Sequence, residues 1–256
     1  MADRHKAAAF TRRDLAVVIA VVFVLVLFLI PAMKRANQKS SRITCISNLK
    51  QIGSAYRIWA NDNFDLFPAF RPQTNGGWRD LLYLTNASAY TWTNYVTMAD
   101  ELGQSPVVLV CPADERKPAK TFSDLVANTN ISYFVGVNAN DTYPQSPLGG
   151  DRNLGPGTTP DSEFGFSPAN GKGNDVIITG PVCWSLKMHS HGNPIGAGNI
   201  LLGDGSAQQT ISGGLYTPGG GSTSGSLYEY WVKNALAEKA AHDKTTNLAV
   251  LRLIFP

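Results

Sequence analysis

The sequence predicts an α+β protein in which a long N-terminal helix, transmembrane in its first half, is followed by a globular head with an antiparallel β-sheet. Three observations lead to this prediction. Residues 15–33 form an uncharged apolar block, apolar residues then recur at three- and four-residue steps, and short β-branched or aromatic runs follow. We therefore expect one helix over residues 10–62 and one head over residues 63–256.

The apolar block has the length of a membrane span. Its 19 residues cover about 30 Å at 1.5 Å per residue, the thickness of the hydrocarbon layer. The alternatives are a buried core helix and a removed signal peptide. No small-x-small cleavage site follows Ile30, which also weighs against a twin-arginine signal at Arg12-Arg13. We expect a single span at about residues 15–33.

Charge is divided unevenly along the chain. Residues 1–57 carry 10 lysines and arginines against two acids, a net of +8, and residues 58–256 carry 12 against 17, a net of −5. A basic stretch beside a span indicates contact with anionic lipid, and we expect no nucleic-acid partner. Four basic residues lie on each side of the span, so the positive-inside rule does not set its orientation.

After the span the helix becomes amphipathic. One face is predicted to be buried and the other carries Lys39, Arg42, Lys50 and Arg57. The buried face consists of Ile43, Ile46, Leu49, Ile52, Gly53, Tyr56, Trp59 and Ala60. The helix should end near residues 61–63, because Pro68 excludes further helix.

The head alternates short elements with loops. We predict a short helix around residues 78–82, strands at 107–110, 131–137 and 176–179, and a loop over the Pro- and Gly-rich residues 138–175. Residues 199–202 and 207–211 should form a hairpin around a type I′ turn at Asp204-Gly205. A capping box at Ser226-x-x-Glu229 predicts a helix to about residue 242, and residues 248–255 are the predicted closing strand.

The cysteines and histidines supply the candidate site residues. Cys45, Cys111 and Cys183 have no metal-binding spacing. We expect three buried thiols. Outside the cytoplasm one disulfide could form instead, and it would join Cys45 to Cys111, since both flank segments that should pack together.

Two imidazoles and a carboxylate lie close together near the hairpin. His189, His191 and Asp204 could hold zinc, or could instead cap and hydrogen-bond the turn. Asp151 and Arg152 could line a site, although we expect a turn with a local ion pair there. No calcium loop of the EF-hand type occurs. We therefore expect no cofactor, with zinc as the alternative that these residues suggest.

A basic leader of residues 1–9 precedes Phe10-Thr11, and Asp14 stands at the edge of the apolar block, where a carboxylate is costly without a role. This N-terminus resembles that of prepilin-type proteins, the type IV pilins and the pseudopilins of type II secretion. The resemblance implies cleavage between Ala9 and Phe10 by prepilin peptidase, N-methylation of Phe10, and pairing of Asp14 with a neighbouring subunit's N-terminal amine. Pro31 matches the family's helix-breaking proline, which kinks or locally melts the helix.

The chain departs from that family at two places. Ala9 stands where the family usually has glycine, and Arg12-Arg13 stand where it has an apolar pair.

Further segments resemble the large pseudopilin-like proteins of planctomycetes and verrucomicrobia. The shared segments are Cys45-x-x-Asn-Leu-Lys-Gln-Ile-Gly53, Phe67-Pro68, Val-Cys-Pro-Ala-Asp114, Ser-Tyr-Phe-Val-Gly136 and Gly150-Asp-Arg-Asn153. These proteins also carry a histidine and an Asp-Gly pair that are separated by nine residues. Here 12 residues separate His191 from Asp204. Major pseudopilins often hold calcium in a C-terminal loop, which is the source of the calcium alternative.

The resemblance implies a structural subunit of a type II secretion or type IV pilus-like filament. It would be a single-pass inner-membrane protein with its head outside the cytoplasm. Its partners would be its own copies, other pilin-like subunits, prepilin peptidase, the inner-membrane assembly machinery and membrane lipid. No enzyme signature occurs, neither a nucleophile elbow, a phosphate loop nor a His-Glu-x-x-His motif. An uncleaved membrane-anchored binding protein and an anchored metalloenzyme using His189 and His191 are the rival hypotheses.

Overall fold

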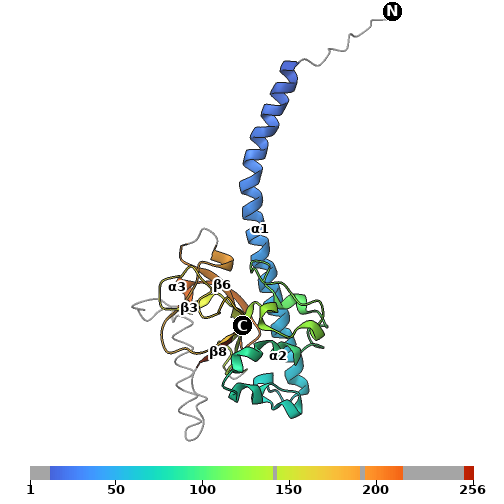
Figure 1. Ribbon diagram of the computed structural model, residues 1–256, viewed down its shortest axis with the longest axis vertical. Coiled ribbons are helices and arrows are strands. Elements are labelled where there is room, and N and C mark those ends of the chain that lie inside the picture. Colours follow the sequence, from blue (N-terminus) through green and yellow to red (C-terminus); the bar gives the residue numbers. More distant parts are fainter. Residues whose placement is uncertain (1–11, 141–142, 191–193, 216–250) are drawn as a thin grey trace, which may run out of the picture. The chain divides into compact units, whose positions relative to one another are not determined.

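The computed structural model describes residues 12–140, 143–190, 194–215 and 251–256 of the chain (Figure 1). It divides into two compact units, residues 1–40 and residues 41–256. The helices are α1 (Arg12–Asp62), α2 (Thr91–Val96) and α3 (Ser212–Leu215). The short 3-10 helices are η1 (Pro68–Phe70), η2 (Gln73–Asn75), η3 (Arg79–Tyr83), η4 (Ala87–Tyr90), η5 (Pro106–Leu109), η6 (Phe122–Asp124), η7 (Asn128–Asn130) and η8 (Met188–Ser190).

The described part of the first unit is the apolar half of α1. Its large apolar side chains are exposed from Leu15 to Ile30. The helix continues through Pro31 without interruption, and a kink at this residue stays a prediction. Proline lacks the backbone N–H that a helix interior uses, and the surrounding turns nevertheless keep the helical conformation.

The second unit is built on the amphipathic half of α1. Cys45, Leu49, Ile52, Tyr56 and Trp59 recur at steps of four and three residues and are all buried. The predicted stripe is thus confirmed from Leu49 onward, and its start is wrong because the Ile43 side chain is 60% exposed. The helix ends at Asp62, as predicted.

The left-handed residues Phe64 and Asp65 turn the chain away from the end of α1. Their φ angles are 62° and 57°. The Asn63 side-chain amide donates to the Trp59 carbonyl oxygen at 2.8 Å and satisfies one of the last acceptors of the helix.

The segment between α1 and the sheet consists of 3-10 turns and α2. The short helix predicted around residues 78–82 is η3. The strand predicted at residues 107–110 is wrong, since this segment is η5, with Pro106 in its first turn and the Val110 N–H bonded to the Val107 carbonyl. A short apolar run does not distinguish a strand from a helical turn, and the proline favours the latter.

The strands are β1 (Tyr133–Gly136), β2 (Pro147–Asp151), β3 (Leu154–Pro156), β4 (Asn174–Ile177), β5 (Val182–Trp184), β6 (Ala197–Leu202), β7 (Ala207–Ile211) and β8 (Arg252–Phe255). Six of them form an antiparallel sheet in the order β4-β8-β1-β2-β6-β7, and β3 pairs with β5 in a separate two-stranded sheet. The mixed helix-and-sheet class with an antiparallel sheet is confirmed. The predicted helix at 226–242 lies outside the described residues.

The predicted loop over residues 138–175 is wrong, because it contains β2, β3 and the start of β4. Prolines and glycines there indicated a loop. In β2, however, Gly150 allows close packing of the sheet, since a Cβ at this position would lie 2.8 Å from both the Asn199 carbonyl oxygen and a Phe134 ring carbon.

The β6–β7 hairpin is confirmed, but its turn is not type I′. That type requires a positive φ at both central residues, whereas Asp204 is not left-handed and Gly205 alone has a positive φ, 78°. The Gly205 N–H donates to the Leu202 carbonyl at 2.8 Å. The Asp204 carboxylate accepts from the Ser206 N–H at 2.8 Å.

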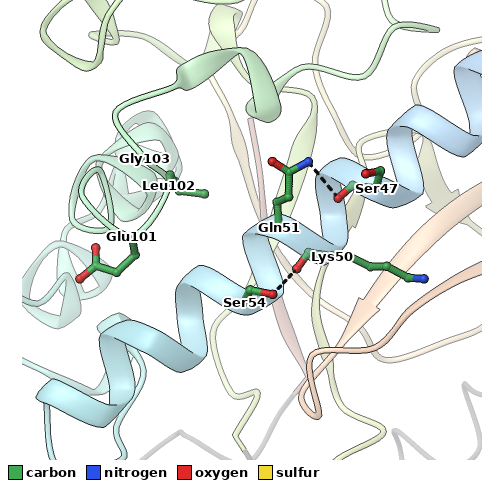
Figure 2. A pocket seen from close by; sticks show the side chains of 7 residues that line it. All are labelled: Ser47, Lys50, Gln51, Ser54, Glu101, Leu102 and Gly103. Carbon is green, nitrogen blue, oxygen red and sulfur yellow. Dashed lines mark hydrogen bonds between the residues drawn. The ribbon is translucent and has the colours of Figure 1, made fainter.

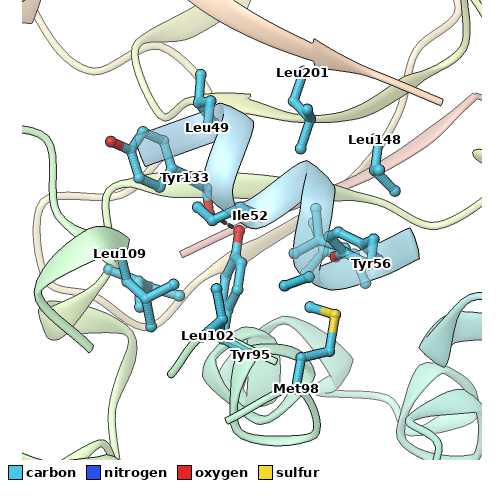
Figure 3. Close-up of a cluster of buried hydrophobic side chains, with 14 of the residues drawn as sticks. Leu49, Ile52, Tyr56, Tyr95, Met98, Leu102, Leu109, Tyr133, Leu148 and Leu201 are labelled. Carbon is cyan, nitrogen blue, oxygen red and sulfur yellow. Dashed lines mark hydrogen bonds between the residues drawn. The ribbon is translucent and has the colours of Figure 1, made fainter. Parts of the chain in front are cut away.

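Side chains from the two faces of the sheet enter two cores. Tyr133 and Leu201 face the first core, which contains the buried stripe of α1, and their neighbours Phe134 and Ile200 face the second. Figure 3 shows the first core, with Leu49, Ile52 and Tyr56 of α1 between the sheet residues and Tyr95, Met98 and Leu102. The helix thus joins the sheet to the 3-10 segment.

Substitution of Gly53 tests this packing. A Cβ at Gly53 would lie 2.8 Å from Leu201 Cδ1 and 2.9 Å from the Gly205 carbonyl oxygen. Helix propensity alone predicts that Gly53→Ala stabilises by about 1 kcal/mol. We expect instead a loss of about 1–3 kcal/mol in the free energy of unfolding, because the side chain overpacks the contact. Denaturation of the full chain in detergent, followed by tryptophan fluorescence, measures it.

The matched control is Ser54→Ala on the exposed face of the same helix, where only a bond to the Lys50 carbonyl is lost. This change should stay within about 0.5 kcal/mol of the parent. A Gly53→Ala variant more stable than the parent would contradict the packing.

Candidate functional site

Four ligand-type side chains converge inside the second unit. They are Cys45 of α1, Cys111 after η5, Asp151 at the end of β2, and His189 in η8. Their sulfur, oxygen and ring-nitrogen atoms all lie within 4.8 Å of one another. Each residue is 4% exposed or less, so solvent does not reach the group, here called the Cys/Asp/His cluster.

Hydrogen bonds link the members of the cluster to one another. The Cys45 thiol donates to Asp151 Oδ1 at 3.1 Å, and Cys111 Sγ lies 3.2 Å from His189 Nε2. That same nitrogen is 3.4 Å from Asp151 Oδ2. The Tyr133 hydroxyl lies 3.2 Å from Cys45 Sγ. The side chains therefore face one common point.

Backbone contacts hold the cluster's segments in place. Asp151 Oδ2 accepts from the backbone N–H of Asn199 at 2.7 Å and from its side-chain amide at 2.9 Å. The Ala113 N–H donates to Cys111 Sγ at 3.4 Å. The Arg42 guanidinium donates to the carbonyl oxygen of His189.

The residue before His189 has a costly backbone conformation. Met188 is left-handed, with a φ of 55°. This conformation costs about 1–2 kcal/mol for a residue with a side chain, and such strain occurs most often near functional sites. It aims the neighbouring imidazole into the cluster.

Burial and mutual contact change the acidity of the four groups. Burial raises the pKa of both Cys45 and Asp151. Burial acts to lower the pKa of His189, but the Asp151 carboxylate and the contact with Cys111 together outweigh it, and the net direction is upward. Burial acts to raise the pKa of Cys111, yet bonds with Cys45 and His189 lower it overall. The cluster thus favours negative charge on Cys111 and a proton on His189.

Arg152 follows Asp151 in the turn after β2 and contacts other partners. Its guanidinium binds Asp114 with two hydrogen bonds, at 2.7 and 2.9 Å, and stacks 3.4 Å from the centre of the Phe164 ring. Burial acts to raise the pKa of Asp114, but Arg152 lowers it overall. The expectation of a local ion pair at residues 151–152 is therefore wrong, since the pair spans 38 residues of sequence.

The predicted zinc ligands are only partly brought together. Of the predicted set, the cluster contains His189; Asp204 lies in the β6–β7 turn, and His191 falls outside the described residues. All three cysteines are free, buried thiols in this structure, and Cys45 and Cys111 both belong to the cluster. The expectation that the segments of these two cysteines pack together is met. Asp151 belongs to the cluster, although the sequence pattern predicted that it would lie in a turn.

Cys183 lies apart from the cluster. It belongs to β5, and its buried thiol donates to the Thr159 carbonyl at 3.3 Å.

The N-terminal part of α1 is the second candidate site. Residues Arg12–Ile30 form the one helix of the described chain that is long and apolar enough to cross a membrane. None of it is buried, so it is not a core helix of the described residues, although a signal sequence would meet the same criterion. Asp14 lies in the first turn of α1. Ala9 and Phe10 fall outside the described residues.

A surface pocket of about 430 Å³ lies beside α1 (Figure 2). Figure 2 shows that Gln51 and Ser54 turn back to their own helix, bonding the carbonyls of Ser47 and Lys50. Lys50 and Glu101 are its only charged lining residues. This pocket brings together no set of groups suited to catalysis or ion binding.

Comparison with known proteins adds no relative. No protein-family model, curated protein or solved structure matches this chain.

The Arg152–Asp114 pair yields a stability prediction. Asp114→Ala leaves the Arg152 guanidinium, 1% exposed, without its principal carboxylate. Loss of one partner of a buried pair costs about 3–5 kcal/mol, and we expect that decrease in the free energy of unfolding. Denaturant titration of the full chain in detergent measures it.

Asp175→Ala is the control, since the Arg252–Asp175 pair is 26% and 30% exposed. Its loss should cost about 0–1 kcal/mol. Equal, small effects of the two substitutions would show that Asp114 does not stabilise the head through Arg152.

Proposed function

We propose that this chain is a pilin-like subunit, held in the inner membrane by the apolar half of α1 and assembled through that helix into a type II secretion or type IV pilus-like filament. One observation carries the proposal. A single helix, Arg12–Asp62, is apolar and exposed over its first part, and its later part supplies the buried stripe of the head. An element built in this way suits a subunit that presents its helix to other molecules.

The exposed half needs an apolar environment. Contiguous apolar surface of this extent marks a membrane or protein interaction. Before assembly the lipid supplies that environment, and in a filament the helices of neighbouring copies do so. The head is placed outside the cytoplasm on the resemblance described above, because the flanking charges are balanced.

Asp14 is the residue assigned to assembly. It stands in the first turn of α1, next to the apolar span. In the proposed filament its carboxylate binds the N-methylated amine of Phe10 in a neighbouring copy. A charge-assisted hydrogen bond in a dry helix bundle is strong, and it fixes the register of one copy on the next.

The two rival functions require properties that differ from those of a filament subunit. An anchored metalloenzyme needs a site open to substrate, whereas the Cys/Asp/His cluster is buried within the described residues. An anchored binding protein would use α1 as a tether and would not self-associate.

Substitution of Asp14 tests the proposal. We expect Asp14→Ala to insert into the membrane and fold as the parent does, but to lose incorporation into filaments on the order of 10²–10⁴-fold, because an unpaired buried amine costs about 3–5 kcal/mol. The amounts of subunit in sheared filaments and in membranes measure this ratio.

Asp62→Ala, at the other end of α1 and exposed, is the matched control and should assemble normally. Normal filament yield from Asp14→Ala would refute the assembly role. Absence of filaments from the parent chain, together with monomeric protein in lipid, would favour the tether.

A further inference from the structure

We propose that Cys45, Cys111, Asp151 and His189 bind one zinc ion, forming a closed structural site inside the head. The inference is independent of the filament proposal, since it rests only on the Cys/Asp/His cluster. It differs from the ligand set that the sequence suggested.

The donor types match zinc. Two thiolates, one imidazole and one carboxylate are ligands that zinc accepts, and four protein ligands give a structural rather than a catalytic site. Calcium does not fit, because it needs six to eight oxygen ligands and the cluster offers mainly sulfur and nitrogen.

The spacing of the donors also matches. With zinc–ligand bonds of about 2.0–2.3 Å, tetrahedral geometry places neighbouring donor atoms about 3.3–3.8 Å apart. Cys45 Sγ lies 3.1 Å from Asp151 Oδ1, and Cys111 Sγ lies 3.2 Å from His189 Nε2. His189 Nε2 is 3.4 Å from the other carboxylate oxygen, Oδ2, and the four ligand atoms all lie within 4.8 Å of one another. Side-chain adjustments of about 1 Å or less would bring these atoms to tetrahedral spacing around an ion.

The surroundings support the ligands in the way that metal sites require. Asn199 donates two hydrogen bonds to Asp151 Oδ2 and so fixes the carboxylate, leaving Oδ1 directed at Cys45. The Ala113 N–H bonds the Cys111 sulfur, and the Tyr133 hydroxyl lies beside the Cys45 sulfur. Outer hydrogen bonds of this kind orient metal ligands and stabilise thiolates.

Charge balance gives the reason for an ion. Three acidic groups share one buried space with a single imidazole. Zinc binds cysteine as the thiolate, so the ion would take the place of the two thiol protons, and its double positive charge would offset both sulfurs. A Cys45–Cys111 disulfide would use the sulfurs but would not explain why Asp151 and His189 point at them.

Bound zinc would join four segments that are distant in sequence. It would link α1 to the turn after η5, to the end of β2 and to η8. The amphipathic half of α1 would then be fastened to the head by metal bonds as well as by apolar packing.

Metal analysis of the full-length protein tests the proposal. We expect an untagged or Strep-tagged chain, purified in detergent without chelators, to contain about one zinc ion per chain. Removal of the metal should lower the Tm, and added zinc should restore it. Cobalt exchange should produce thiolate-to-cobalt absorption in the near ultraviolet, a readout that needs no substitution.

Single substitutions identify the ligands. Cys111→Ser should lose most of the zinc, and Cys183→Ser, another buried thiol away from the cluster, should keep it. Zinc retained in Cys111→Ser, or no thiolate absorption after cobalt exchange, would overturn the assignment. So would native protein without zinc, whether its peptides show a Cys45–Cys111 bridge or free thiols.

Discussion

The packing of the amphipathic half of α1 is the constraint on which the head depends. Leu49, Ile52 and Tyr56 fill the space between the sheet and the 3-10 segment, and Gly53 lets the helix approach the β6–β7 turn closely. Because Cys45 lies one turn before Leu49 on the same face, this packing also positions the first member of the Cys/Asp/His cluster. Apolar burial and the candidate metal site therefore share one helix face.

Two adjacent residues, one ending β2 and one in the turn after it, organise the buried polar groups. Asp151 enters the Cys/Asp/His cluster, and Arg152 binds Asp114. Both groups are almost fully buried, and each is satisfied by partners from distant segments. Such pairs add little net stability compared with apolar residues, but they penalise any arrangement in which one partner is missing. They thereby favour one register of the sheet.

Local patterns predicted much of the fold, and long-range contacts account for the errors. Residues that are neighbours in the sequence predicted the buried stripe of α1, the end of this helix at Asp62 and the β6–β7 hairpin. Strand β2 was not predicted, because its proline and glycines are also typical of a loop. The helical turn η5 was predicted as a strand, because a run of four apolar residues shows no periodicity that would distinguish the two. The site was found only in part: His189 stood out, but Cys45 and Asp151 are 106 residues apart, and only the sheet topology brings them together.

Helix α1 packs the head with its second half, and in the proposed function its first half joins subunits. The most direct test of this joining role is the N-terminal mass of native protein taken from membranes. A pilin-like subunit should begin at an N-methylated Phe10, the residue that supplies the amine for a neighbouring Asp14. A native chain that still begins at Met1 would contradict assembly by this route and would leave α1 a simple anchor.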